Sequence, residues 1–238
     1  MKNGQSAALS LSNDQLQVIL TGKFGDGCLE TPKDSNNESK YVTNCIHKEY
    51  LQFKKDLLGE LCTGNINYVE KNGFKGSPIY TLVSHRHPDI TYIKNLDIES
   101  SLNLLDDLGV ALWFYDDGSL HKDKLFYNLN TQAYSEEINR DLFVPYLKEN
   151  YNIIAKPTIE RKKDGREFWY LRISKFEGAY EISEILNKYP VESYRYKIWS
   201  SETSQLWRKL QEELKSTDME NCSNKMKSCI LKKLEQTM

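Results

Sequence analysis

Two segments of the 238-residue chain end in the same four-residue pattern, and this repeat constrains the fold more than any other feature. Residues 12–29 (SNDQLQVILTGKFGDGCL) and 100–120 (SSLNLLDDLGVALWFYDDGSL) each consist of an apolar, helix-like stretch that closes on Asp-Gly-x-Leu. In the first segment the apolar residues recur at helical spacing, and Ser12 with Gln15 can form a capping box. Glycine predicts where each helix ends, near Gly25 in the first segment and at Asp-Asp-Gly in the second.

The stretches that follow the two helices are also alike. The first helix is followed by a strand-like run at 41–47, a helix-like run at 48–61, and two strand-like runs around a glycine turn. The second is followed by a strand-like run at 124–132, a helix-like run at 135–149, and two strand-like runs around Asp164-Gly165, which is a good hairpin signal. Each half therefore contains a helix, two strands, a helix, two strands and a helix.

This order predicts an α+β fold built from one unit repeated twice. We assign the first half to residues 12–98 and the second to residues 99–204, and we expect a partly mobile, helical C-terminal extension at 205–238. The content of 39% hydrophobic and 28% charged residues is typical of a soluble globular protein. No apolar run approaches the ~20 residues that span a bilayer, and the first residues contain no secretory signal. We therefore expect an intracellular protein without a membrane segment.

The charge of the chain is unevenly distributed. The formal net charge is −2 and the isoelectric point is near 6.1, whereas nucleic-acid-binding domains are usually basic. Between Lys156 and Lys175, however, the chain has seven basic and three acidic residues, which gives a local net charge of +4. Binding needs only one basic face, so the composition is compatible with a nucleic-acid partner. The five cysteines are scattered and odd in number, and we expect reduced thiols rather than a zinc site.

Asp26 and Asp117 occupy an electrostatically unfavourable place at the ends of the two predicted helices. The helix dipole leaves partial negative charge at a C-terminus, so an uncompensated aspartate there costs roughly 0.3–1 kcal/mol. Two such acids at matching places of a repeat indicate a compensating cation. If the helices pack side by side, which the small residues Thr21, Gly22 and Gly25 would allow, the two carboxylates meet and repel unless a divalent ion lies between them.

Paired carboxylates that hold hard cations suit the hydrolysis of phosphodiesters. Mg²⁺ accepts one or two carboxylates and completes its shell with water and phosphate oxygens. Divalent ions at such a site activate water and stabilise the charge of the transition state. A pseudo-twofold axis through the two acids also fits duplex DNA, because the strands of a duplex are themselves related by a twofold axis.

The two motifs resemble those of a known family. ILTGKFGDG (19–27) and VALWFYDDG (110–118) are similar to the two motifs of single-chain LAGLIDADG homing endonucleases, and in particular of the group that contains the yeast mitochondrial omega-intron enzyme. The resemblance covers roughly residues 14–204 and includes NLNTQ (128–132) and YKIWSSET (196–203). It implies two αββαββα halves related by pseudo-twofold symmetry, with antiparallel sheets that bind DNA.

The resemblance also implies which residues form the active site. In the family the last acid of each motif binds the catalytic metal, and this role falls on Asp26 and Asp117. Main-chain atoms of Gly25 and Asp116 would add metal contacts, while the side chain of Asp116 is expected to make a helix-end or turn contact. The implied cofactor is Mg²⁺, for which Mn²⁺ would substitute.

Two lysines and a set of polar residues complete the implied site. Lys94 and Lys197 occupy the positions of the basic residues that support the active site in close relatives. DNA would be read by exposed residues of the sheets, since Asn and Gln suit adenine while Arg and Lys suit guanine or phosphate. In the first half the candidate readers are Lys33, Lys40, Thr43, Asn44, Asn67, Lys71, Lys75, Tyr80, Ser84 and Arg86. In the second half they are His121, Lys122, Lys124, Tyr127, Asn128, Asn130, Gln132, Lys156, Thr158, Arg161, Lys163, Arg166 and Arg172.

These features predict a monomeric, Mg²⁺-dependent endonuclease that cuts both strands of one long site in double-stranded DNA. The resemblance implies intron or intein homing in a bacterium, a phage-infected cell or an organelle. Three alternatives stay open on the sequence. The chain could be a maturase that binds group I intron RNA on the same fold, a DNA-binding regulator that does not cleave, or an unrelated soluble protein with an incidental repeat.

Overall fold

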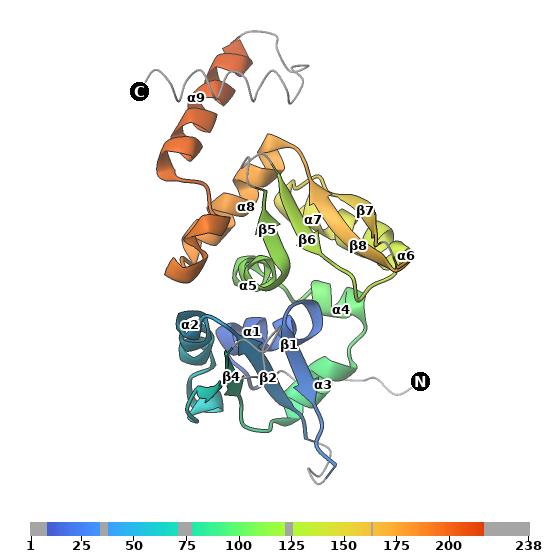
Figure 1. Ribbon diagram of the computed structural model, residues 1–238, viewed down its shortest axis with the longest axis vertical. Helices are drawn as coiled ribbons and strands as arrows, with labels where there is room; N and C mark the ends of the chain where they lie inside the picture. The colour runs from blue at the N-terminus through green and yellow to red at the C-terminus, as the bar shows by residue number, and fades with distance from the viewer. Residues whose placement is uncertain (1–8, 34–37, 71–77, 122–125, 163, 217–238) are drawn as a thin grey trace. The chain divides into compact units, whose positions relative to one another are not determined.

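The computed structural model describes most of the chain, and its elements form two compact units (Figure 1). The first unit runs to Asp116 and also includes Val191–Ser193, while the second comprises Asp117–Pro190 and the residues from Tyr194 onward. No helix in the described part of the chain is long and apolar enough to cross a membrane. The described residues are 9–33, 38–70, 78–121, 126–162 and 164–216.

The first unit contains a four-stranded antiparallel sheet with the strand order β1-β2-β4-β3. Helices α1 and α2 pack on one face of this sheet, as Figure 1 also shows. The elements of this unit are α1 (Asn13–Phe24), β1 (Gly27–Glu30), β2 (Lys40–Cys45), α2 (Lys48–Leu58), the 3₁₀ helix η1 (Gly59–Cys62), β3 (Asn67–Val69), β4 (Ile79–Val83), α3 (Pro88–Asn95), α4 (Ile98–Leu102) and α5 (Asp107–Asp117).

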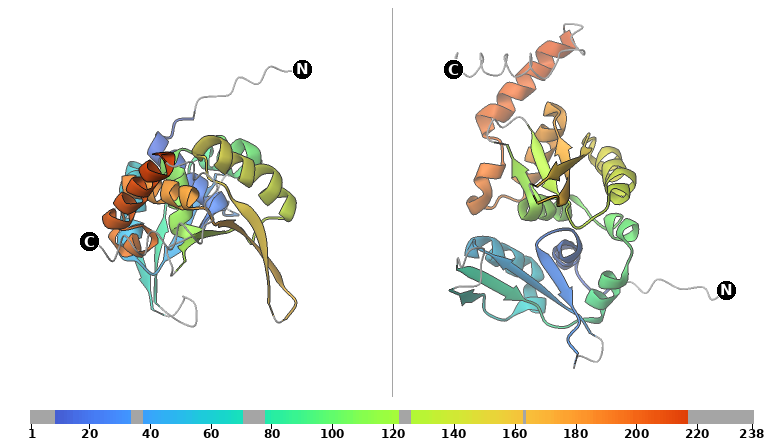
Figure 2. Two further views of the ribbon diagram at one scale, coloured as in Figure 1. Left: turned by 90° about the horizontal axis from the view of Figure 1, so that it is seen from above. Right: turned by 45° about the vertical axis from the view of Figure 1, so that its right-hand side comes forward.

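The second unit repeats this plan with the strand order β5-β6-β8-β7. Figure 2 shows the long β7–β8 hairpin with the helical segment from α6 to α7 on one side of it. The predicted α+β repeat is thereby confirmed. The elements are β5 (Gly118–Leu120), β6 (Tyr127–Asn130), α6 (Glu136–Ile138), the π-helical turn η3 (Asn139–Phe143), α7 (Val144–Tyr151), β7 (Lys156–Arg161), β8 (Glu167–Ile173), α8 (Phe176–Lys188), the 3₁₀ helix η4 (Glu192–Lys197) and α9 (Ser201–Ser216).

Local sequence signals explain several element boundaries. Ser12 and Gln15 form the expected capping box at the start of α1, and the helix ends at Phe24, where the Gly25 N–H still bonds to the Thr21 carbonyl at 2.9 Å. The predicted hairpin turn also forms, with Gly165 at a φ of 83°, a left-handed conformation that glycine adopts without strain.

Helices α1 and α5 pack closely within the first unit. The rings of Phe24 and Trp113 lie 5.3 Å apart, and the buried Gln17 side chain donates to the carbonyl of Leu104 at 2.9 Å. A Cβ atom on Gly109 would lie 2.2 Å from Gln17 Oε1, so a larger residue there would displace the Gln17 side chain. Every residue of α5 from Leu108 to Tyr115 is buried, as an apolar helix without a polar face requires.

Glycine has a different role in α1 from the one we expected. A Cβ atom on Gly22 would lie 2.5 Å from Leu29 Cδ2, so Gly22 allows α1 to approach its own sheet rather than α5. A Cβ atom on Gly25 would lie 2.4 Å from Asp116 Oδ2, so Gly25 does face the end of α5. Of the two glycines, only Gly25 therefore serves the predicted helix contact.

The compact units and the repeated halves divide the chain at different points. Along the chain, the boundary between the two units falls between Asp116 and Asp117, at the C-terminal end of α5. The halves predicted from the repeat divide before that helix. Val191–Ser193 joins the first unit, in which the Glu49 carboxylate accepts hydrogen bonds from the Glu192 and Ser193 amides at 3.1 Å each. The halves 12–98 and 99–204 and the extension 205–238 stay predictions about the repeat.

Candidate active site and nucleic-acid face

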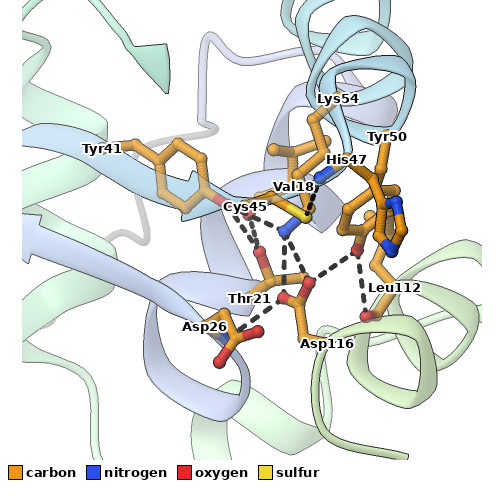
Figure 3. Close-up of polar contacts among 10 residues, drawn as sticks. All are labelled: Val18, Thr21, Asp26, Tyr41, Cys45, His47, Tyr50, Lys54, Leu112 and Asp116. Carbon is orange, nitrogen blue, oxygen red and sulfur yellow. Dashed lines mark hydrogen bonds and ion pairs between the residues drawn. The ribbon is translucent and has the colours of Figure 1, made fainter. Parts of the chain in front are cut away.

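Asp26 lies in the short link between the end of α1 and the start of β1. The residue is exposed, and its main-chain N–H donates to Asp116 Oδ2 at 3.2 Å. Figure 3 shows the Asp26 carboxylate projecting from the edge of a buried polar cluster to which Asp116, Lys54, Tyr50 and Tyr41 contribute side chains. The first motif therefore ends with an exposed acid beside a second acid that is buried.

The Asp116 carboxylate is fully hydrogen-bonded. Its side chain is 1% exposed, and Lys54 Nζ donates to both of its oxygens at 2.9 Å. The hydroxyl of Tyr50 donates to Oδ1 at 2.7 Å, and the amide of Asp26 donates to Oδ2. An ionised carboxylate offers about four lone-pair sites, and these contacts use them all.

Lys54 is a charged residue at full burial, with a side chain that is 0% exposed. Burial alone opposes its charged form, but the Asp116 carboxylate and the Tyr41 hydroxyl, 3.2 Å from Nζ, outweigh that effect and raise the pKa of Lys54. Lys54 therefore stays charged. Tyr41 extends the network to α1 through a 3.0 Å contact with the Thr21 hydroxyl. Removing one partner of such a pair typically costs about 3–5 kcal/mol, because the other charge is left buried and unpaired.

Lys54 and its tyrosine partners are missing from the residues predicted from the sequence. The signal was present, because Lys54 occupies the buried stripe that Tyr50, Leu51 and Leu58 form on α2. A lysine at an apolar position of an amphipathic helix indicates a buried counter-charge. The sequence did not show that Asp116, sixty-two residues further along the chain, supplies it.

The structure corrects the predicted location of Lys94. Its Nζ donates to Thr31 Oγ1 at 2.7 Å, and Thr31 directly follows β1, whereas Asp26 directly precedes that strand. The two ends of a four-residue strand are separated by more than ~10 Å at about 3.3 Å per residue. Lys94 is thus held at the opposite end of β1 from Asp26, because the chain from β4 into α3 leads it there.

Asp117 borders an open groove in the second unit. The groove has a volume of about 470 Å³, and Asp117 shares its lining with the predicted readers Asn128, Asn130 and Gln132. Burial, together with the charge of Asp117, raises the pKa of Tyr134 to about 12, so this phenol is neutral at physiological pH. An acid and hydrogen-bonding amides therefore face one space that is large enough for parts of a nucleotide.

Strand register explains why these residues share a face. Directly paired residues of neighbouring antiparallel strands point to the same side of a sheet. Asn128 pairs with Ser119 on β5 and with Arg172 on β8, which in turn pairs with Lys156 on β7. A second polar row crosses the same sheet at Asn130, Tyr170 and Thr158. These rows alternate with the buried residues Tyr127, Leu129, Leu171 and Ile173.

The basic residues among the predicted DNA readers of the second unit make ring contacts and ion pairs. The guanidinium carbon of Arg172 lies 4.2 Å from the ring centroid of Phe126, on which the His121 ring also stacks. Arg161 pairs with Glu167 at 2.8 Å, and Arg166 pairs with Asp164 at 2.7 Å, near the tip of the hairpin. Lys122, Lys124 and Lys163 lie outside the described residues.

Three predicted readers prove to be core residues. Thr43 is 2% exposed and pairs with Leu82 on the helix-covered face of its sheet. Ser84 is 6% exposed and accepts a hydrogen bond from the Tyr41 amide at 2.9 Å. Tyr127 is 1% exposed, and its hydroxyl donates to the carbonyl of Lys197. Their burial is incompatible with direct contact to DNA, so these assignments were wrong.

The other predicted readers of the first unit are distributed over its surface. Asn44 lies on the open face of the sheet, where Thr81 Oγ1 donates to its Oδ1 at 2.6 Å. Tyr80 lies on the opposite face, that of Leu82, and its ring contacts Tyr68 at 5.4 Å. Exposed or half-buried positions are also occupied by Lys33, Lys40, Asn67 and Arg86, whereas Lys71 and Lys75 lie outside the described residues.

Lys197 is buried at the end of η4 in the second unit. Its side chain is 6% exposed in total, and its Nζ lies 4.6 Å from the ring centroid of Tyr194. Its main chain is tied to β6 through the Tyr127 hydroxyl. The catalytic role assigned to Lys197 stays a prediction.

The donors present fit the expected divalent cation. Asp26 is exposed and Asp117 half-buried, and both offer hard carboxylate oxygens of the kind that Mg²⁺ and Mn²⁺ accept. The Asp116 side chain is unsuited to join them, because its lone pairs are already used within the protein. Within the described ranges, no group of three or more His, Cys, Asp and Glu side chains is arranged to hold a metal ion.

Comparison with known proteins adds a family and a fold. The model of the LAGLIDADG DNA endonuclease family matches residues 17–179, which is more than half of the chain. A structure titled as the homing endonuclease I-WcaI bound to its DNA recognition sequence aligns with a TM-score of 0.65 and 18% identity, over 80% of this chain and 88% of that one. This likeness concerns the fold.

Two further similarities are more distant. A variant of the homing endonuclease I-DmoI, in complex with nicked target DNA and Mn, aligns with a TM-score of 0.50 and 12% identity, over 75% of this chain and 99% of that one. Protein RecA of Mycobacterium leprae is 31% identical over 121 residues, or 46% of this chain. The match spans only 16% of the length of that RecA protein.

Proposed function

Since this chain belongs to the LAGLIDADG DNA endonuclease family, we propose that it makes a metal-dependent double-strand break in one long DNA site. The proposal rests above all on the groove of the second unit, where Asp117 and the amide side chains of Asn128, Asn130 and Gln132 share one lining. Those amides suit the edges of adenine, while the acid suits a cation at the sugar–phosphate backbone.

The roles of the individual residues follow from their chemistry. Asp26 and Asp117 would each hold a Mg²⁺ or Mn²⁺ ion, and Gly25 and Asp116 would add main-chain contacts. The bound cation would supply Lewis-acid charge at the scissile phosphate. Asn128, Asn130, Thr158, Lys156 and Arg172 would read bases or bind phosphates from the polar rows of the second sheet. Lys197 would support the second acid.

The wider assignment is also a proposal. Two motifs in one chain favour a monomer, which needs no second subunit to present two acids. The likeness of NLNTQ and YKIWSSET supports the group of the yeast mitochondrial omega-intron enzyme, and with it a role in homing. We place the enzyme inside a bacterium, a phage-infected cell or an organelle. A maturase role on intron RNA and a purely regulatory role on DNA are the outcomes that a failed cleavage test would favour.

The proposal is tested by cleavage of a randomised duplex library with Mg²⁺, Mn²⁺ or Ca²⁺. We expect discrete double-strand breaks with Mg²⁺ and Mn²⁺, and binding without cutting in Ca²⁺. Asp26→Asn and Asp117→Asn should each slow cleavage by at least about a thousandfold, equivalent to roughly 4 kcal/mol of transition-state stabilisation. The control Asp56→Asn, an exposed carboxylate on α2, should cut normally.

The outcomes separate the alternatives. Breaks that both aspartate variants retain would reject the assigned acids. A sequence that the wild-type protein enriches but never cuts would support a DNA-binding regulator. Binding of group I intron RNA, together with faster splicing and without DNA cleavage, would support the maturase.

A further inference from the structure

Asp116 is placed to control the conformation of the Gly25–Asp26 link. Its Oδ2 accepts the main-chain N–H of Asp26 at 3.2 Å. A Cβ atom on Gly25 would lie 2.4 Å from that same oxygen, so the carboxylate lies directly against the backbone of the link. The contact therefore joins the second motif to the main chain that carries the acid of the first.

Neither side chain of the Lys54–Asp116 pair can act directly on DNA or on a cation. Both side chains are buried, at 0% and 1% exposed. The three N–H groups of Lys54 have acceptors in the two Asp116 oxygens and the Tyr41 hydroxyl. Asp116 in turn accepts from Lys54, Tyr50 and the Asp26 amide. Both side chains are therefore directed inward, and Asp116 reaches the exposed link through its hydrogen bond with the amide of Asp26.

Stability alone gives little reason for such a pair. Replacing a buried ion pair by apolar residues of similar volume is often neutral or stabilising. An aspartate at the C-terminal end of α5 is also unfavourable towards the helix dipole. What an apolar pair could not supply is a fixed acceptor for the amide of Asp26.

We propose that Lys54 and Asp116 are positioning residues, which fix the main chain of Asp26 so that its carboxylate is held in the orientation that cleavage requires. This inference rests on the proposed function, because it needs Asp26 to be a metal-binding acid. Lys54 holds the Asp116 carboxylate in place, Tyr50 sets its rotation, and Asp116 fixes the link. A displacement of about 1 Å at a reacting group can cost about a hundredfold in rate.

Two double variants test the acceptor while the charge stays matched. Lys54→Met with Asp116→Asn removes both charges but keeps an oxygen acceptor for the Asp26 amide. Lys54→Met with Asp116→Leu removes both charges and the acceptor. In single-turnover cleavage at saturating DNA, we expect the asparagine version to stay within about threefold of wild type and the leucine version to fall about a hundredfold. Duplex affinity measured in Ca²⁺ should be equal in both.

A second measurement does not depend on activity. The hydrogen-exchange rate of the Asp26 amide can be followed by NMR in the full chain without metal or DNA. We expect slow exchange in the wild type and in the asparagine version, and exchange at least about tenfold faster in the leucine version, because the amide loses its acceptor. Wild-type exchange and wild-type cleavage in the leucine version would overturn the proposal.

The design separates this inference from the proposed function. If the wild type cuts no duplex, the proposed function fails, while the exchange rates still decide whether Asp116 fixes Asp26. If the leucine version does not fold, Gly25→Ala replaces it, since the added Cβ must displace the carboxylate. Gly64→Ala is its control, because a Cβ there meets no atom within 4 Å. Equal exchange and equal cleavage in these two variants would also overturn the proposal.

Discussion

Asp26 and Asp116 lie one hydrogen bond apart, yet their carboxylates have opposite surroundings. Asp26 is exposed and follows α1, while the Asp116 side chain is 1% exposed and lies in the last turn of α5. Every lone-pair site of Asp116 has a partner within the protein. Both positions are acidic, but burial leaves the Asp26 carboxylate at the surface and encloses that of Asp116.

The surroundings of the two motif acids differ in the same way. Beside Asp26 the protein has a buried ion pair, in which Lys54 offsets the charge of Asp116. Beside Asp117 it has Tyr134, a mostly buried phenol whose pKa is raised to about 12. The two halves of the repeat thus share a backbone plan and differ in their electrostatics. Variants of buried residues, each compared with a variant of an exposed residue, test how far this contrast holds.

The largest effect is expected from Lys54→Met alone. The substitution leaves the Asp116 carboxylate buried without its counter-charge, which should lower the free energy of unfolding by about 3–5 kcal/mol. The matched control is Lys48→Met, because Lys48 is an exposed lysine on the same helix. Urea denaturation followed by circular dichroism measures both. If the two variants lost the same stability, the buried pair would not differ from a surface lysine.

Tyr50→Phe should have the next largest effect. It removes the 2.7 Å hydrogen bond to Asp116 Oδ1 and keeps the ring, which also packs 4.6 Å from Lys54 Nζ. A hydrogen bond to a charged group contributes about 1.5–3 kcal/mol, and the same urea titration should register a loss of that size. Tyr92→Phe is the control, because Tyr92 is 50% exposed on α3. A loss no larger than that of the control would mean that solvent or Lys54 replaces the phenol.

The sequence predicted local features well because local chemistry determines them. The capping box at Ser12, the helix end at Gly25 and the turn at Gly165 each depend on residues within a few positions of one another. The repeat then predicted one α+β plan built twice, and each unit contains a four-stranded antiparallel sheet. Asp117 lines one groove with Asn128, Asn130 and Gln132, and their roles stay predictions.

Features that depend on distant parts of the chain could not be predicted in this way. Lys54 meets Asp116 only after α2 and α5 have packed, and Lys94 reaches Thr31 only because α3 packs beside β1. The wrong assignments of buried residues to DNA contact have another cause. Side chains alternate along a strand, so the pattern has two possible phases, and an error of one residue exchanges the faces. Thr43 and its neighbour Asn44 were both assigned to the open face, although adjacent strand residues point to opposite faces and Asn44 is the one that lies there.

Asn44 and Thr43 extend the contrast between buried and exposed side chains to DNA binding. Asn44→Ala should weaken binding to the preferred duplex by about 1–3 kcal/mol, the contribution of a good contact to a base. Thr43→Val should leave affinity unchanged, since this side chain is 2% exposed and faces the helices. Fluorescence anisotropy in Ca²⁺ at fixed salt measures both affinities. A weaker Thr43→Val complex would reverse the assignment of the two faces.

Asp89 supplies a third carboxylate, whose burial lies between that of Asp116 and that of Asp26, and the smallest effect. Partial burial opposes its charge, but hydrogen bonds from the Ser10 hydroxyl and amide and from the Leu11 amide outweigh this and lower the pKa of Asp89. The folded protein therefore binds this proton less tightly than the unfolded chain does. The resulting stability is present above about pH 4 and is lost as the pH falls through the folded pKa.

Asp89→Asn should remove that dependence on pH. We expect a loss of no more than about 1 kcal/mol at neutral pH, because the site is partly exposed and screened, and a shallower decline of the melting temperature below about pH 4. Melting curves at several acidic pH values, compared with those of wild type, measure the difference between the two slopes. Parallel curves would show that the Ser10 contacts hold Asp89 without favouring its ionised form. Asp116, Asp89 and Asp26 would then differ in how deeply they are buried, and the contacts of Asp89 would not favour its charged form.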